Sequence, residues 1–257
     1  MTDREVDWPD YLAGFHARRT GVVEDVLSQA LRADHSPYRW LARVVSADAT
    51  TVVDLASGSG PVARELAQPG RTVVGVDLSD AELRLARRRG AGPLVRADAR
   101  VLPFRAGSVD VVTSALGLVV VRPLEALLAE VVRVLRPGGV LAAIAPAARP
   151  LAPADLRQLS RLNVRLRSTP RFPGPVELTG FRRALAEQGM TVVEDKRERY
   201  RFTVTTSDDA ALLLSALYLP LTPQARVSAA LDHLSETAER RGPVEIGIPM
   251  RRVVAIK

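Results

Sequence analysis

Short apolar runs alternate with amphipathic segments along the middle of this 257-residue chain, and no other feature constrains the fold as much. The runs are rich in valine and too short for helices, which is typical of strands buried on both faces of a parallel sheet. They lie at 51–55, 72–76, 93–97, 109–114 and 140–145, with helical patterns at 61–68, 80–90 and 123–135 between them. Pro137-Gly138-Gly139 follows as a helix stop. This alternation predicts an α/β fold built on a doubly wound, mostly parallel sheet.

The two ends of the chain depart from this alternation and predict helical additions to the core. After residue 150 we expect helices at 155–167, 178–188, 207–219 and 223–241, and strands at 190–204 and 244–257. Ser207 and Thr222 are the expected caps of the last two helices. The chain therefore divides into an N-terminal helical cap (1–50), a core (51–204 with 243–257) and a helical insertion or lid (205–242).

Arginine supplies nearly all of the positive charge, since Lys196 and Lys257 are the only lysines. A net charge of +7 indicates either an anionic partner or the arginine bias of a GC-rich genome, and we favour the second. The chain contains no cysteine, which excludes disulfides, cysteine-ligated metals and a cysteine nucleophile. No apolar run approaches the roughly 20 residues of a membrane span, and the polar N-terminus is unlike a secretory signal. We therefore expect a cytoplasmic protein without a membrane part.

The segment 52–60 combines an acidic strand end with a small-residue loop that leads into a helix. Gly58, Gly60 and Ala63 match the glycine pattern of dinucleotide-binding loops, but that pattern alone is weakly specific. Asp54 before the loop would repel a pyrophosphate and suits a ligand with an ammonium group and no phosphate. S-adenosylmethionine (SAM) is such a ligand. Asp77, at the end of the next strand, can accept from both hydroxyls of a ribose.

Three further motifs complete a series: Asp98-Ala99 after the third strand, the segment 107–114, and the segment 130–141. In this order and spacing the series resembles the class I SAM-dependent methyltransferase family, whose fold is Rossmann-like. The resemblance covers 50–150 in detail and departs from the family at Ala56, where glycine is frequent, and at Pro61. It implies SAM as the cofactor, held at the following residues. Asp54, Ala56, Ser57, Gly58, Ser59 and Gly60 contact the methionine part, Asp77 the ribose, and Asp98 and Ala99 the adenine, while Ser114 lies where the strand-four loop meets the methyl group. Leu78 is a further cofactor-binding residue.

The residues that would complete a catalytic site are less clearly marked. The strand-four loop, 114–118, lacks the Asn/Asp-Pro-Pro-Tyr/Phe motif of nucleic-acid amino-methyltransferases and contains no histidine. We also find no acidic cluster for a metal, so we expect catalysis without one. His16 in the N-terminal cap is the candidate base, with packing in a half-buried helix as the alternative. The same two interpretations apply to possible pocket residues of the cap, which are Tyr11, Arg19, Tyr38 and Trp40.

A row of arginines and an apolar helix leave the acceptor open. Arg157, Arg161 and Arg165 lie on one stripe of a helix, which indicates either a solvated face or a site for a carboxylate, a phosphate or RNA. The stretch 212–219, with Tyr218, suits a lid over a partly apolar acceptor, or equally a core or dimer contact. We favour transfer of a methyl group to an O, N or C atom of a small metabolite. An RNA methyltransferase and a SAM-binding protein without transferase activity remain alternatives, and the oligomeric state stays open, a homodimer included.

Overall fold

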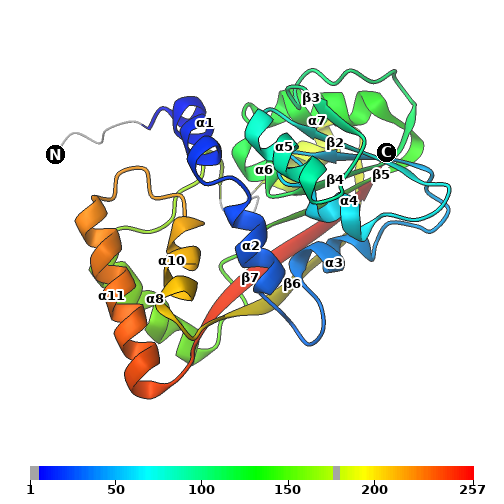
Figure 1. Cartoon of the computed structure of the whole chain (residues 1–257). Coiled ribbons are helices and arrows are strands. Elements are labelled where there is room, and N and C mark those ends of the chain that lie inside the picture. The colour runs from blue at the N-terminus through cyan, green and yellow to red at the C-terminus, as the bar shows by residue number, and fades with distance from the viewer. Residues whose placement is uncertain (1–5, 176–179) are drawn as a thin grey trace.

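The computed structural model describes residues 6–175 and 180–257, and its centre is a single seven-stranded sheet (Figure 1). The strands are β1 (Thr51–Leu55), β2 (Thr72–Asp77), β3 (Leu94–Arg96), β4 (Val109–Ala115), β5 (Leu135–Pro146), β6 (Thr191–Val204) and β7 (Val244–Ile256). Their order is β3-β2-β1-β4-β5-β7-β6, and β7 is antiparallel to both of its neighbours. The chain order reverses between β1 and β4, so ligands are expected at the carboxyl ends of these strands. The predicted doubly wound, mostly parallel sheet is confirmed.

Helices cover both faces of the sheet because neighbouring residues of each buried strand point to opposite sides. Val52 of β1 packs into one apolar layer, whereas Val53 and Leu55 pack into the other. The first layer includes side chains of α3 (Pro37–Ala42), α4 (Pro61–Glu65) and α5 (Asp80–Arg88). The second includes side chains of α6 (Gly117–Val120), α7 (Leu124–Val134) and α9 (Phe181–Glu187).

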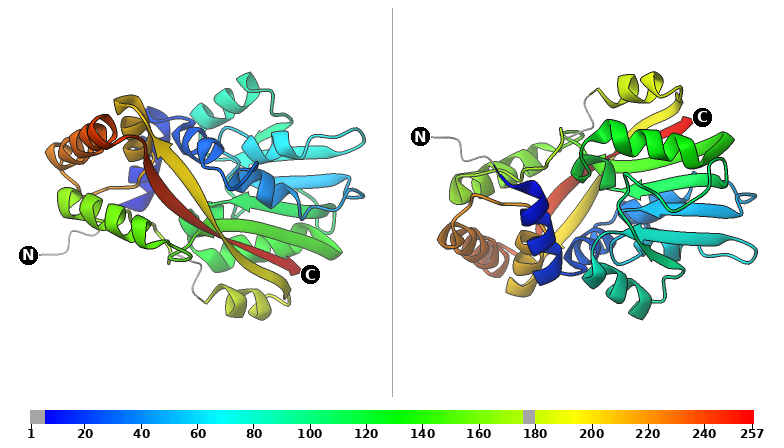
Figure 2. Two further views of the ribbon diagram at one scale, coloured as in Figure 1. Left: turned by 90° about the horizontal axis from the view of Figure 1, so that it is seen from below. Right: turned by 90° about the horizontal axis from the view of Figure 1, so that it is seen from above.

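The remaining helices form a second body of structure beside the sheet (Figure 2). They are α1 (Trp8–Arg18), α2 (Val22–Gln29), α8 (Pro153–Leu166), α10 (Ser207–Ser215) and α11 (Gln224–Arg241). The long strands β6 and β7 reach out of the sheet to this group, where α11 packs against α8 and α10. In the described part of the chain, no helix is both long and apolar enough to span a membrane.

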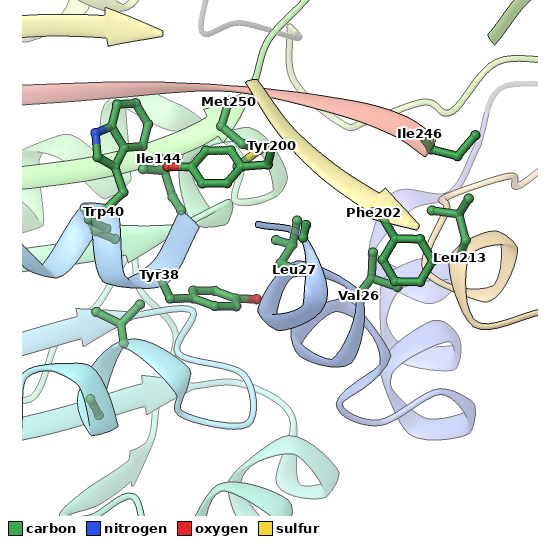
Figure 3. Close-up of a cluster of buried hydrophobic side chains, with 14 of the residues drawn as sticks. Val26, Leu27, Tyr38, Trp40, Ile144, Tyr200, Phe202, Leu213, Ile246 and Met250 are labelled. Carbon is green, nitrogen blue, oxygen red and sulfur yellow. The ribbon is translucent and has the colours of Figure 1, made fainter. Parts of the chain in front are cut away.

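A shared core joins the N-terminal helices to the long strands (Figure 3). Val26 and Leu27 of α2 and Trp40 of α3 are buried with Tyr200 and Phe202 of β6. The guanidinium carbon of Arg252 lies 4.3 Å from the centroid of the Trp40 ring, and this arginine also donates to the Trp40 carbonyl oxygen. Trp40 therefore belongs to the core.

Several local expectations were wrong. Thr206, not Ser207, caps α10, because its hydroxyl accepts from the Asp209 N–H. The α11 helix follows Pro223 without a side-chain cap, and the Thr222 hydroxyl is buried with no partner among the described residues. The proline–glycine stop at 137–139 does follow the end of α7 at Val134, as predicted, and its residues lie within β5. The start of the helix expected at 178–188 falls outside the described residues, and the short α6 was not anticipated.

Candidate cofactor and acceptor cavity

A cavity of about 570 Å³ lies at the carboxyl ends of the parallel strands, and this volume is in the usual range for small-molecule sites. Its floor is the loop after β1 together with the ends of β2, β3 and β4. Its other wall consists of α1, the start of α2 and Tyr218. The sheet therefore supplies one side of the cavity and the helical body the other.

The loop after β1 is shaped by its backbone. Ala56, Gly58 and Gly60 all have positive φ, the region that most side chains avoid. A Cβ on Gly60 would lie 2.4 Å from the Cβ of Ala91, so glycine is required there for packing as well. Pro61 begins α4 in its first turn, where the absent N–H costs nothing. The loop thus presents backbone, not side chains, to a ligand.

Asp77 ends β2 at the rim of this loop. Its carboxylate oxygens accept from the N–H of Gly58 and the N–H of Ser79, both at 2.8 Å. Burial raises the pKa of Asp77, although these two donors and the nearby His16 act in the opposite direction. The carboxylate lines the cavity and keeps lone pairs for further donors, such as ribose hydroxyls.

Asp54 lies behind the loop, 1 % exposed, and does not itself line the cavity. One carboxylate oxygen accepts from the Thr113 hydroxyl at 2.8 Å, and the other is buried with no hydrogen-bond partner in the described residues. Burial raises its pKa to about 7, with the negative charge of Asp77 adding to the effect. An unpartnered buried carboxylate beneath a cavity is a costly feature, and a cationic ligand above the loop would reduce that cost.

At the ends of β3 and β4, two of the predicted cofactor residues line the cavity and one does not. Asp98 and Ala99 line the cavity, and Arg100 donates to both Asp98 oxygens from its Nε, at 2.9 and 3.1 Å. This pairing holds the pKa of Asp98 below its ordinary value. Ser114 is placed differently from the expectation: it is fully buried and donates to the Leu55 carbonyl oxygen at 3.0 Å. Ala115, Leu116 and Gly117 line the cavity in its place.

His16 of α1 faces the cavity and connects two other polar side chains. Its Nδ1 lies 3.0 Å from Glu82 Oε1, and its Nε2 lies 3.1 Å from the Tyr218 hydroxyl. Glu82, on α5, is buried and also accepts from the Gly21 N–H, between α1 and α2. All three side chains line the cavity.

Of the other residues predicted to contact the acceptor, one lines the cavity and five do not. Tyr38 lines the cavity and is buried, which raises the pKa of its hydroxyl. Tyr11 and Arg19 lie beside the cavity: the Tyr11 hydroxyl accepts from the Leu219 N–H, and Arg19 donates to the Ser215 carbonyl oxygen. Trp40, in the core, and Arg157 and Arg161, exposed on α8, are outside it. Within residues 6–175 and 180–257, no three His, Asp or Glu side chains form a metal-binding group.

Two buried acids of the cavity, Glu82 and Glu24, were missed from the sequence. Glu24 of α2 accepts from the Ser59 hydroxyl of the loop and pairs with Arg64 and Arg89. Each acid lies in a helix near other charged residues, so its neighbours in sequence do not distinguish it from an exposed glutamate. The spacing gives one weak signal for Glu82: it precedes Ala86, which is buried, by four residues on the same helix face.

Comparison with known proteins agrees with this arrangement. The profile of a family described as a methyltransferase domain matches residues 53–143. A demethylmenaquinone methyltransferase from Parafrankia sp. is 36 % identical over 181 residues, which cover 60 % of this chain and 70 % of that protein. This chain belongs to the class I SAM-dependent methyltransferase family.

Two further comparisons show how far the similarity extends. A demethylmenaquinone methyltransferase from Beutenbergia cavernae is 39 % identical over 141 residues, which cover 54 % of this chain and 58 % of that protein. This chain therefore spans less than two thirds of that relative's length. A putative methyltransferase from Bacillus halodurans superposes with a TM-score of 0.60 at 20 % identity, over 86 % of this chain and 98 % of that one. At this identity the second similarity shows the methyltransferase fold alone.

Proposed function

We propose that this chain transfers the methyl group of SAM to a small, largely apolar acceptor. The observation that carries the proposal is the two-sided cavity. Its sheet side has the glycine loop and Asp77, and its helical side combines apolar side chains with His16. A base beside an apolar surface suits an acceptor that has one acidic hydrogen and is otherwise apolar.

The sheet side would hold the cofactor. Asp77 would accept from the ribose hydroxyls, the loop 56–60 would approach the methionine part, and Asp98 and Ala99 would contact the adenine. Asp54, with its unpartnered oxygen, would balance the ammonium charge from behind the loop. When bound, SAM supplies an electrophilic methyl group on a sulfonium that becomes a neutral thioether after transfer.

The helical side would hold the acceptor. Trp8 and Leu12 of α1 supply its apolar lining, and Val120 and Val121 at the end of α6 and Pro173 before α9 line the cavity next to them. The relatives are named for demethylmenaquinone, and we extend that to an acceptor class for this chain: hydroxyl-bearing aromatic rings with an apolar substituent. The helices within 6–50 and 205–242 would act as a cap that excludes water from the transfer.

His16 would act as the base. The acceptor loses its acidic hydrogen toward the imidazole while its nucleophilic atom takes the methyl carbon, so the positive charge moves from sulfur to His16. Positioning and exclusion of water supply the rest of the rate, because a sulfonium is already activated. RNA is disfavoured as the acceptor, since Arg157 and Arg161 lie outside the cavity.

Incubation with SAM radiolabelled in its methyl group and a panel of acceptors tests the proposal. The panel would hold reduced naphthoquinones with a short prenyl chain, simple phenols, primary amines and total RNA. We expect label in the reduced naphthoquinones or phenols, and His16→Gln should lower the rate by about 100-fold or more. Label found only in RNA or amines would contradict the proposed acceptor class.

A further inference from the structure

Glu82, His16 and Tyr218 form a continuous hydrogen-bonded chain that lines the cavity, from α5 beside the sheet to the helical side. We propose that Tyr218 relays the acceptor's proton to His16 and that Glu82 is a positioning residue, which sets the tautomer of His16 and stabilises its charged form. The inference rests on the proposed function and assigns roles to two side chains that the cofactor site does not require. The three come from α5, α1 and the segment after α10, so the relay exists only when the cap is in place.

The direction of the relay follows from the chemistry of its partners. An ionised carboxylate only accepts, so the His16 nitrogen beside Glu82, Nδ1, carries the hydrogen of the neutral ring. Nε2 is then the free acceptor, and the Tyr218 hydroxyl at 3.1 Å donates to it. The Gly21 N–H holds Glu82 in place, at 3.1 and 3.2 Å from its two oxygens.

The electrostatic surroundings favour His16 as the final site of the proton. Glu82 faces it from α5, Asp77 faces it from the end of β2, and Tyr218 completes the shell. Burial raises the pKa of Tyr218, and the nearby Tyr11, Glu82 and Asp77 add to the effect. A lone tyrosinate is therefore disfavoured, and a proton that reaches the Tyr218 oxygen must be matched by one that leaves it for His16.

The step is balanced as a double proton transfer. The acceptor's acidic hydrogen moves to the Tyr218 oxygen while the Tyr218 hydrogen moves to Nε2 of His16. The acceptor keeps the electron pair of its broken bond to hydrogen and would use it for the new bond to the methyl carbon, while the electron pair of the S–CH3 bond would stay on the sulfur. Tyr218 ends neutral, and the imidazolium of His16 lies against Glu82 until it releases its proton to solvent.

Nitrogen-15 NMR of histidine-labelled full-length protein, without any acceptor, tests the positioning role. His16 is assigned among the three histidines with His16→Gln. We expect a neutral ring protonated at Nδ1, and a shift of the population toward the Nε2-protonated tautomer in Glu82→Gln, because the charged acceptor for the Nδ1 hydrogen is replaced by an amide. Asp25→Asn is the matched control, since Asp25 also links α2 to α5, through Arg89, without contacting His16. It should leave the His16 tautomer unchanged.

Tyr218→Phe tests the relay and keeps the ring packed against Phe15 and Phe172. The Nε2 resonance of His16 should move, and kcat with a reduced short-chain prenyl naphthoquinone should fall about tenfold or more at little change in KM. Tyr200→Phe removes another buried tyrosine hydroxyl, which donates to Glu198 outside the cavity, and should do neither. An Nε2-protonated ring, a His16 tautomer population unchanged by Glu82→Gln, or an unshifted Nε2 resonance in Tyr218→Phe would each overturn the inference. These NMR readouts need no turnover, so they are distinct from a failure of the acceptor class.

Discussion

The sheet side and the helical side of the cavity are built in different ways. On the sheet side, loops with positive φ at Ala56, Gly58 and Gly60 bring backbone to the ligand, and Asp77 is fixed by two backbone N–H donors. On the helical side the contacts are between side chains of distant segments, as in the pairing of His16 with Glu82 and Tyr218. The first side is local in sequence, and the second is assembled by tertiary packing.

The two sides should therefore tolerate different changes. A side chain added to the loop after β1 should destabilise the fold, because the loop backbone cannot shift to make room for it. On the helical side, an added group can be accommodated where a flexible neighbouring side chain moves, but removal of one polar group should lower activity.

Adding one methyl group to a glycine on each side gives the largest contrast. Gly60→Ala places a side chain at a φ of +83° and against the Cβ of Ala91, so we expect a loss of about 2–4 kcal/mol in the free energy of unfolding. Gly14→Ala, inside α1, meets only the movable guanidinium of Arg18 and should be neutral or stabilising by up to about 1 kcal/mol. Urea unfolding measures both, and equal costs at the two sites would contradict the distinction.

Asp54 should give the sheet side a pH-dependent stability. Its folded-state pKa of about 7 lies above the ordinary value of 3.8, so the folded chain binds more protons between these values. Stability from this group is present at acidic pH and is lost as the pH rises toward 7, by about 2–3 kcal/mol between pH 5 and pH 8. Asp54→Asn should remove that slope. Urea unfolding at both pH values checks it, and a variant with the wild-type slope would show that the effect belongs to another group.

The exposed arginines of α8 should matter least. Replacing Arg157, Arg161 and Arg165 by glutamate should change SAM affinity by less than about twofold, because Arg157 and Arg161 are exposed and none of the three lines the cavity. A gel shift with total RNA at about 50 and 200 mM salt should show weak wild-type binding with a shallow salt dependence. Tight binding that collapses with salt and vanishes in the variant would instead favour an RNA acceptor.

The sheet side could be predicted from the sequence better than the helical side. The strands and the sheet class could be read from the valine-rich runs, and Asp77 from its strand end, because these signals are local. Ser114 was misplaced because a strand-end position does not say which way the side chain points. For Trp40 the sequence left a pocket position and packing equally open. The stacking of Arg252 from β7 places it in the core, and no local pattern reports that contact.

The helical side shows why the rest could not be predicted. His16 and Tyr218 were named, but nothing joins positions 16, 82 and 218 until the chain folds. Glu82 in particular reads as one more charge on an amphipathic helix, yet tertiary packing buries it beneath α1. The predictions of Ser207 and Thr222 as caps were wrong because a hydroxyl near a helix start does not by itself determine which residue begins the helix.

Calorimetric titration of SAM, and separately of NAD⁺, into the wild type and Asp77→Ala tests whether the sheet side of the cavity is a SAM site. We predict one SAM site per chain, no measurable preference for NAD⁺, and a loss of at least about tenfold in SAM affinity in the variant, as expected when a charged hydrogen-bond acceptor is removed. Asp77→Asn, which keeps an acceptor for the Gly58 N–H, should lose less. Unchanged SAM affinity in Asp77→Ala, or tighter binding of NAD⁺ than of SAM to the wild type, would contradict the account.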